Sequence, residues 1–252
     1  MSIIILVLIT AYLGMCTGMY FLQSRFIYFP TILQNPGVQR FDLVRPDAVL
    51  QIVTHTHDGT KAVIYFGGNA EDVSLSLPDY VAAFPQTAIY MLCYRGYGGS
   101  TGSVSEKTMH TDAQALYDKV SNLHSEVTVI GRSIGTGVAI RLAANNLVSR
   151  LILITPFDSL VSLAQRSFPY LPVGWLLKER YESYRVAPKI RVPTLILVAA
   201  DDEIIAARQV QRLVDSFTEV TPAVKVIENA GHNSISAYPE FWRTIFQFVE
   251  LP

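Results

Sequence analysis

Charge and cysteine are both scarce in this chain. Asp, Glu, Lys and Arg make up 16% of the 252 residues, against about a quarter in typical globular proteins. The formal net charge is −1, and nothing in the composition indicates a nucleic-acid-binding protein. The two cysteines, Cys16 and Cys93, lie in the apolar N-terminus and at the end of an expected buried strand. Two such positions exclude a disulfide framework and leave the redox compartment open.

Charge is missing altogether from the first part of the chain. Residues 2–22 contain no Asp, Glu, Lys or Arg, and this run is about as long as a helix that spans a bilayer. A cleaved signal peptide is the alternative, but no basic residue precedes the run and no small-residue cleavage site ends it. We predict an uncleaved transmembrane anchor over residues 1–23, which makes the lipid bilayer a partner of this protein. The sequence leaves the side of the membrane open.

A juxtamembrane segment and linker are expected over residues 24–47. Arg25 is placed to reach the lipid headgroups, and Tyr28 and Phe29 suit the membrane interface. The alternative is that these aromatic residues make the first contact with a folded core. An edge strand is expected at Phe41–Val44.

From residue 48 the chain alternates between short apolar runs and amphipathic stretches. This alternation is typical of a mostly parallel sheet with helices on both faces, so residues 48–252 are predicted to form one α/β domain. The expected strands are Val49–Thr54, Ala62–Phe66, Ala88–Cys93, Val127–Ile130, Leu151–Thr155, Thr194–Ala199 and Ala223–Ile227. The expected helices are Leu77–Ala83, Glu106–Leu123, one running to Asn145, Arg208–Phe217 and Phe241–Val249.

One motif stands at the centre of this pattern. Gly131-Arg132-Ser133-Ile134-Gly135 lies between an expected strand and an expected helix, and G-x-S-x-G in that context is typical of a catalytic serine. The sharp turn strains the serine backbone and requires small neighbours. We therefore predict Ser133 as a nucleophile; a structural turn serine is the alternative.

A serine nucleophile needs a base, and the base needs an orienting acid. His232 is the only histidine after Ser133, and it follows the last expected strand. The acid is expected after the preceding strand, where Asp201 and Asp202 both stand, and spacing alone does not separate them. Asp158 is a third candidate.

An oxyanion hole requires two backbone N–H groups. We predict that Ile134, the residue after the nucleophile, supplies one. Asn69, in the loop Gly67-Gly68-Asn69, is expected to supply the other, because glycines permit a close backbone approach. A plain tight turn is the alternative for the two glycines.

The predicted chemistry implies no cofactor. His55 and His57 form an H-x-H pair that is common in metal sites. No third ligand is evident beside them, so we interpret the pair as a strand end and predict no metal site.

The chain resembles the α/β-hydrolase superfamily, and within it the Bem46-like group of membrane-anchored serine hydrolases. The matching stretches are Ser24–Pro30, Tyr65–Ala70, Tyr94–Gly98, Gly131–Gly135, Pro193–Ile196 and Ala230–Asn233. The resemblance implies an α/β-hydrolase fold with a small cap at about residues 156–192 and one N-terminal transmembrane helix before the domain. It also implies a catalytic triad of Ser133, Asp202 and His232.

The choice of Asp202 over Asp201 comes from this resemblance, which aligns Asp202 with the aspartate of the group's G-x-x-D-x-x-V-P stretch. Two departures from the group are visible. Gly67 stands where relatives have a histidine that orders the oxyanion loop, so a looser loop is expected. Ala206 stands where relatives have proline, which is expected to loosen the acid loop similarly.

The sequence as a whole predicts a serine hydrolase that cleaves an acyl ester or thioester. Apolar residues in the cap, together with the anchor, favour a lipid-like acyl ester or an acylated protein as substrate. The alternatives are a serine peptidase of the aminopeptidase type and a non-catalytic binding protein on the same scaffold. The oligomeric state stays open.

Overall fold

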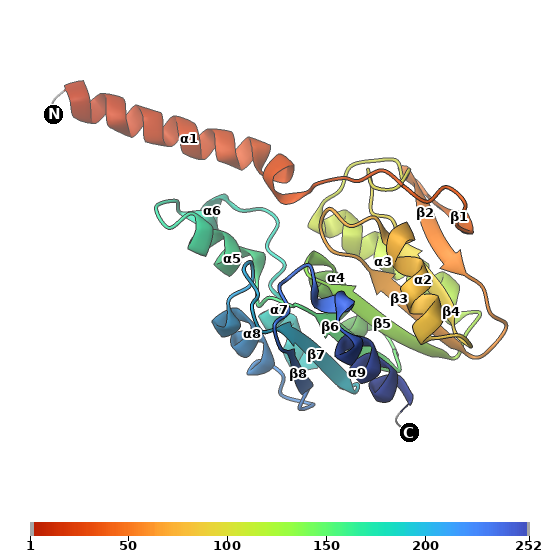
Figure 1. The fold of residues 1–252 in the computed structure, drawn as a ribbon. Helices are drawn as coiled ribbons and strands as arrows, with labels where there is room; N and C mark the ends of the chain where they lie inside the picture. Colours follow the sequence, from red (N-terminus) through yellow and green to blue (C-terminus); the bar gives the residue numbers. More distant parts are fainter. Residues whose placement is uncertain (1–2, 251–252) are drawn as a thin grey trace.

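The computed structural model describes residues 3–250, and an eight-stranded sheet lies at its centre (Figure 1). The strands are β1 (Arg40–Arg45), β2 (Ala48–His55), β3 (Lys61–Phe66), β4 (Ala88–Leu92), β5 (Glu126–Arg132), β6 (Arg150–Ile154), β7 (Thr194–Ala199) and β8 (Ala223–Ile227). Their order across the sheet is β1-β2-β4-β3-β5-β6-β7-β8. All neighbours from β4 to β8 pair in parallel, whereas β2 is antiparallel to both β1 and β4.

The helices lie on both faces of this sheet and before it. They are α1 (Ile3–Ile27), α2 (Val73–Ala83), α3 (Glu106–Ser121), α4 (Ile134–Asn145), α5 (Leu160–Ser167), α6 (Val173–Leu176), α7 (Ser183–Val186), α8 (Ala207–Val214) and α9 (Pro239–Glu250). Two short 3-10 turns occupy Ala187–Lys189 and Ile235–Ala237. The predicted α/β architecture is therefore confirmed.

Each face of the sheet carries its own hydrophobic core. On one face, Leu116 of α3, Val138 of α4 and Leu213 of α8 belong to one buried cluster. On the other face, Tyr80 of α2 and Phe241 of α9 belong to a second cluster. A sheet buried on both sides explains why its central strands are continuous apolar runs.

The sheet begins earlier than the predicted domain boundary at residue 48. Strand β1 pairs along its whole length with β2, from Arg40 opposite Val53 to Arg45 opposite Ala48. The edge strand expected at Phe41–Val44 is therefore confirmed as β1, and it belongs to the sheet of the domain.

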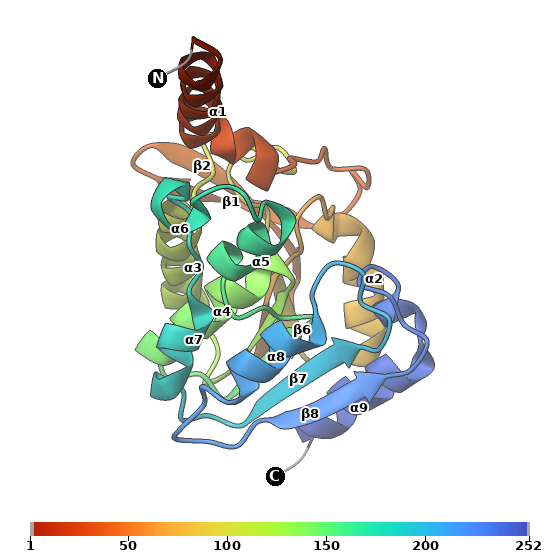
Figure 2. The same cartoon turned by 90° about the vertical axis from the view of Figure 1, so that its left-hand side faces the viewer.

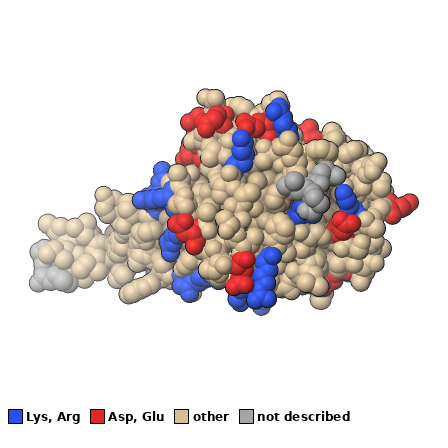
Figure 3. All heavy atoms as spheres, turned by 90° about the horizontal axis from the view of Figure 1, so that it is seen from below, with Lys and Arg blue, Asp and Glu red and all other residues tan. Residues whose placement is uncertain are grey.

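Helix α1 is long and apolar enough to cross a membrane, by its length and composition, and it projects from the rest of the molecule (Figure 1). Lys and Arg side chains gather where this helix meets the body, whereas the rest of the projection carries no charge on the face in view (Figure 3). The helix ends at Ile27, four residues beyond the predicted end of the anchor at residue 23.

The last turns of α1 and the residue after them contact the cap segment, which the sequence did not indicate. The Gln23 side chain is buried, donates to the Leu176 carbonyl at 3.1 Å and accepts from the Lys178 N–H at 2.7 Å. Tyr28, predicted at the membrane interface, is instead buried, and its hydroxyl donates to Glu179 at 2.8 Å. The alternative interpretation, a first contact with the folded core, is the correct one for Tyr28.

The segment between β6 and β7 forms the predicted cap from short helices. Figure 2 shows α7 beside α8, with α5 and α6 above them, toward α1. Pro169, Pro172 and Gly174 interrupt the segment, which explains why none of its helices exceeds eight residues. The cap also packs against α1, because Cys16, Leu171 and Val173 share a small buried cluster.

Candidate active site

Strand β5 leads into helix α4 through a strained turn at Ser133. Its backbone has φ 49° and ψ −118°, a left-handed conformation that is costly for a residue with a side chain. A Cβ on Gly135 would lie 2.1 Å from the Phe66 carbonyl oxygen, and one on Gly131 would lie 2.5 Å from the Gly135 oxygen. Both glycines are thus required by backbone packing, and the turn presents Ser133 beyond the end of the sheet.

Ser133, His232 and Asp202 form one chain of hydrogen bonds. The Ser133 Oγ lies 3.0 Å from His232 Nε2, and His232 Nδ1 lies 2.8 Å from Asp202 Oδ2. The three residues follow strands β5, β8 and β7, whose carboxyl ends meet at one edge of the sheet. The imidazole is 3% exposed, so its orientation is fixed by these two partners. The arrangement can take a proton from Ser133 and hold the resulting imidazolium.

Asp202, and not Asp201, forms the hydrogen bond with His232. The Asp202 Oδ1 accepts the N–H groups of Ile204 at 2.9 Å and Ile205 at 2.7 Å, while Asp201 is exposed. These two backbone hydrogen bonds fix the carboxylate although Ala206 stands in place of the group's proline. The acid loop is therefore held, contrary to the looser loop expected from the sequence.

The third acid candidate, Asp158, has other partners. It is buried, accepts a hydrogen bond from the Ser162 hydroxyl and forms an ion pair with Arg212 at 3.1 Å. Neither contact involves His232, so Asp158 is not brought into the candidate site.

The two predicted oxyanion donors lie at the same cavity as Ser133. A Cβ built on Gly68 would be 3.7 Å from the Ser133 Cβ, which places the loop beside Ser133. The Gly68 N–H is already donated to Glu71 at 2.6 Å. Among residues 3–250, the Asn69 and Ile134 N–H groups have no hydrogen-bond acceptor, so both are free to receive a negative oxygen.

Glu71 holds the oxyanion loop where relatives use a histidine. Its carboxylate accepts the Gly68 N–H, the Tyr65 hydroxyl at 2.8 Å and the Ser76 hydroxyl at 2.8 Å. Burial, and secondarily the charge of Glu71, raise the pKa of Tyr65 well above its usual value. Tyr65 therefore stays protonated and keeps donating. Glu71 thus holds the loop at Gly68, although no histidine stands at position 67.

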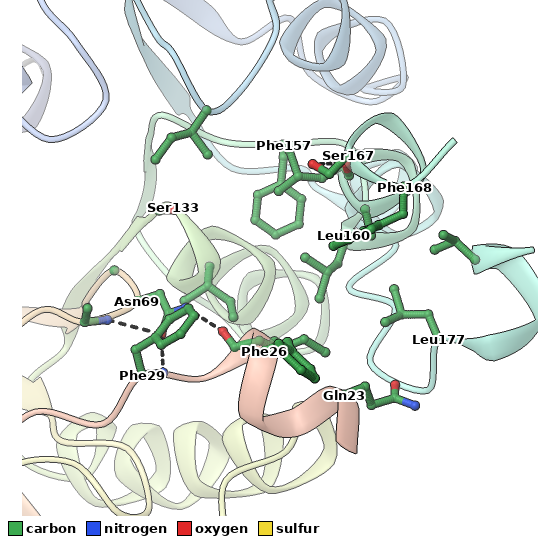
Figure 4. Close-up of a pocket in the computed structure, with 18 of the residues that line it drawn as sticks. Gln23, Phe26, Phe29, Asn69, Ser133, Phe157, Leu160, Ser167, Phe168 and Leu177 are labelled. Atoms are coloured by element: carbon green, nitrogen blue, oxygen red, sulfur yellow. Dashed lines mark hydrogen bonds between the residues drawn. The ribbon is translucent and has the colours of Figure 1, made fainter. Parts of the chain in front are cut away.

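The Asn69 side chain ties the same loop to the end of α1. Its Oδ1 accepts the Phe29 N–H at 3.0 Å and the Tyr97 hydroxyl at 2.9 Å, and its Nδ2 donates to the Ile27 carbonyl at 2.5 Å. The residue whose N–H faces the cavity is thus positioned by three contacts of its own side chain (Figure 4).

Two further charged residues, which were not among the predicted site residues, support the loop that carries His232. Glu203 accepts the His232 N–H at 3.0 Å, and this hydrogen bond lowers the pKa of Glu203. Arg132 donates to the Asn233 carbonyl at 3.1 Å. Their proximity to Asp202 and Ser133 in the sequence was a usable signal, because residues beside a catalytic group often hold the neighbouring loop.

Ser133 and His232 lie at a cavity of about 610 Å³ with mostly apolar walls, a size within the range of small-molecule sites. Phe157, Leu160 and Leu177 of the cap segment form one side (Figure 4). Residues of α1 form another, as Figure 4 shows for Gln23 and Phe26. Ser133 therefore lies at a pocket suited to an apolar group.

The chain is similar in sequence to known proteins of other organisms. The chain is 30% identical to the uncharacterized protein MT2364 of Mycobacterium tuberculosis, over 87% of this chain and 84% of that protein. It is 28% identical to the protein bem46 of Schizosaccharomyces pombe, over 82% of this chain and 73% of the relative. No model of a known protein family matches the chain.

A solved structure shows the same fold. The esterase Pf2001 of Pyrococcus furiosus superposes with a TM-score of 0.70 at 19% identity, over 89% of this chain and 98% of the esterase. The chain belongs to the α/β-hydrolase superfamily, in its Bem46-like group. It shares the α/β-hydrolase fold with this esterase and with a monoacylglycerol lipase of Paleococcus ferrophilus, which superposes with a TM-score of 0.61 at 17% identity, over 79% of this chain and 98% of the lipase.

Proposed function

We propose that this protein is a serine hydrolase that cleaves an acyl ester or thioester through an acyl-enzyme. The observation that supports it most is the hydrogen-bonded chain of Ser133, His232 and Asp202 at an apolar cavity. The base is within hydrogen-bond reach of the nucleophile on one side and of the orienting acid on the other.

The reaction runs in two halves. His232 Nε2 takes the proton of the Ser133 hydroxyl as Oγ attacks the acyl carbonyl, and the N–H groups of Asn69 and Ile134 bind the oxyanion. The carbon–oxygen or carbon–sulfur bond then breaks, and the departing alcohol or thiol takes the proton from His232. Water, deprotonated by His232, attacks the acyl-enzyme and releases the carboxylic acid with free Ser133.

The cavity favours an acyl substrate over a peptide with a free amine. An aminopeptidase needs a carboxylate free to bind the ammonium group. Glu71 is the only acidic residue that lines the cavity, as far as residues 3–250 show, and its oxygens already hold Gly68, Tyr65 and Ser76. Each buried methylene contributes about 0.8 kcal/mol, so a few extra carbons raise specificity by about a hundredfold.

A chain-length series tests the proposal. We expect the full-length protein in detergent micelles to cleave nitrophenyl esters and acyl thioesters, with kcat/KM rising from acetyl to medium and long chains. Aminoacyl amides, assayed beside them, are expected to be poor substrates. Faster cleavage of the amides would favour the peptidase, and a sharp preference for acetyl would contradict the acyl-chain proposal.

Membrane association is the second part of the proposal, supported by the length, composition and projection of α1. We expect the intact protein to stay with the membrane pellet after washing with high salt and with alkaline carbonate, because an apolar spanning helix is not released by either. N-terminal sequencing of the recovered protein is the control. A mature form that starts near residue 20 would show a cleaved signal peptide instead.

A further inference from the structure

Helix α1 is a wall of the active-site cavity as well as a candidate anchor. Met19, Gln23, Phe26 and Ile27 all line the cavity. Their spacing of i, i+4, i+7 and i+8 places them on one face of the helix. From Met19 to Phe26 this face extends about 10 Å along the helix axis. The cavity therefore follows α1 for about two turns.

The lining face of α1 is fixed to the cap. Buried Cys16 packs with Leu171 and Val173, and Gln23 bonds to the backbone on both sides of Leu177, at Leu176 and Lys178. Lys178 Nζ also lies 4.0 Å from the centre of the Tyr20 ring. The wall made by α1 is thus part of the folded domain.

The cavity runs from the nucleophile toward the apolar part of α1. The C-terminal end of the helix adjoins the oxyanion loop, because the Asn69 side chain bonds to the Ile27 carbonyl. Met19 lies two turns farther along, within the uncharged stretch predicted to cross the bilayer. A chain attached at Ser133 and lying along α1 would therefore point in the direction of the membrane.

The openings of the cavity are apolar as well. Four large apolar lining residues are strongly exposed: Phe26 by 59%, Phe29 by 52%, Phe168 by 46% and Ile204 by 42%. Exposed apolar side chains grouped at one place mark a surface that contacts lipid or another apolar partner. Arg25, beside Phe26, is the first charged residue of the chain, so the exposed Phe26 lies at the end of the apolar run.

We propose that the substrate's acyl chain enters the cavity directly from the bilayer and lies along α1, whose Met19 limits the chain length. The substrate class is a long-chain acyl ester or thioester whose chain is held in the membrane. This inference rests on the proposed hydrolase function and adds to it the route of the chain and the residue that selects its length.

Met19→Trp tests the selection, with Leu22→Trp as the matched control. Both variants enlarge one apolar residue of the same helix, but Leu22 is exposed and does not line the cavity. In phosphatidylcholine vesicles we measure inactivation by alkyl fluorophosphonates of increasing chain length. Met19→Trp is expected to slow the longest probes at least tenfold and leave the shortest within twofold, whereas Leu22→Trp should match the wild type throughout. Equal profiles for the two variants would overturn the proposal.

The short probe separates this inference from the hydrolase function. If it fails to label the wild type, the serine mechanism has failed, and chain binding is then measured alone in Ser133→Ala. A photoreactive long-chain fatty acid in the same vesicles is expected to crosslink to the cap at α5 and α6, and an excess of ordinary fatty acid should compete. Crosslinking should be lost in Met19→Trp and kept in Leu22→Trp. Its absence from the cap in Ser133→Ala would refute the chain route whether or not the protein is a hydrolase.

Discussion

Ser133→Ala is expected to lower the turnover of any acyl ester by roughly 10⁶-fold and to abolish labelling by fluorophosphonates. The Ser133 Oγ is the only protein atom that forms a covalent bond with the substrate in the proposed mechanism. Without this hydroxyl, His232 Nε2 has no serine proton to accept. The fold should persist. Within residues 3–250, the Ser133 side chain makes no hydrogen bond except that to His232, and alanine tolerates the strained backbone about as well as serine does.

Ser167→Ala is the matched control for this variant. Ser167 lines the same cavity but is exposed and lies on helix α5 of the cap. Its variant should keep near wild-type turnover, and thermal unfolding should be unchanged for both proteins. Substantial residual activity in Ser133→Ala, with an unchanged preference for substrates, would disprove the serine mechanism.

The sheet and the serine turn were predictable because their signals are local. Central strands such as β5 and β7 are short apolar runs bounded by turns. A strand that is buried on both faces needs apolar side chains at nearly every position. Gly131 and Gly135 are required by close contacts with backbone atoms. The two glycines of the motif therefore predict the sharp turn at Ser133. The position of His232 followed from the order of strands along the chain.

Contacts between distant segments were not predictable in this way. Tyr28 looked like an interfacial residue, and its partner Glu179 lies 151 positions later. Gln23 was expected at the end of an anchor and instead bonds to the cap. An apolar sequence shows that a side chain avoids water, but lipid and protein satisfy that requirement equally. Only the folded arrangement distinguishes them.

The contacts that hold the oxyanion loop were not predictable from the sequence either. The absence of a histidine at Gly67 was visible in the sequence, and a looser loop followed from it. Glu71, four residues after Gly67, accepts the hydrogen bond from the Gly68 N–H that holds the loop. A carboxylate near the loop was visible too, but its three simultaneous contacts depend on Tyr65 and Ser76 facing the same point.

The acid of the proposed triad gives the second large effect, and two adjacent aspartates allow a paired test of it. Asp202→Asn preserves shape while removing the charge that stabilises the imidazolium, and its amide can present an N–H to His232 Nδ1. The histidine would then hold its proton on Nε2, where it cannot accept the proton of Ser133. We expect kcat to fall by about 10⁴-fold.

Asp201→Asn removes the same charge one residue earlier and should change kcat by less than about threefold. The Asp201 side chain is exposed, and its contact with the histidine loop is made by its backbone N–H to the Ala230 carbonyl. That hydrogen bond survives the substitution. Steady-state kinetics on both variants, with a medium-chain nitrophenyl ester, are compared with the rate of fluorophosphonate labelling. Both readouts should fall for Asp202→Asn alone, since each requires deprotonation of Ser133. A large loss in Asp201→Asn, or near-normal turnover in Asp202→Asn, would show that a different carboxylate orients His232 during the reaction.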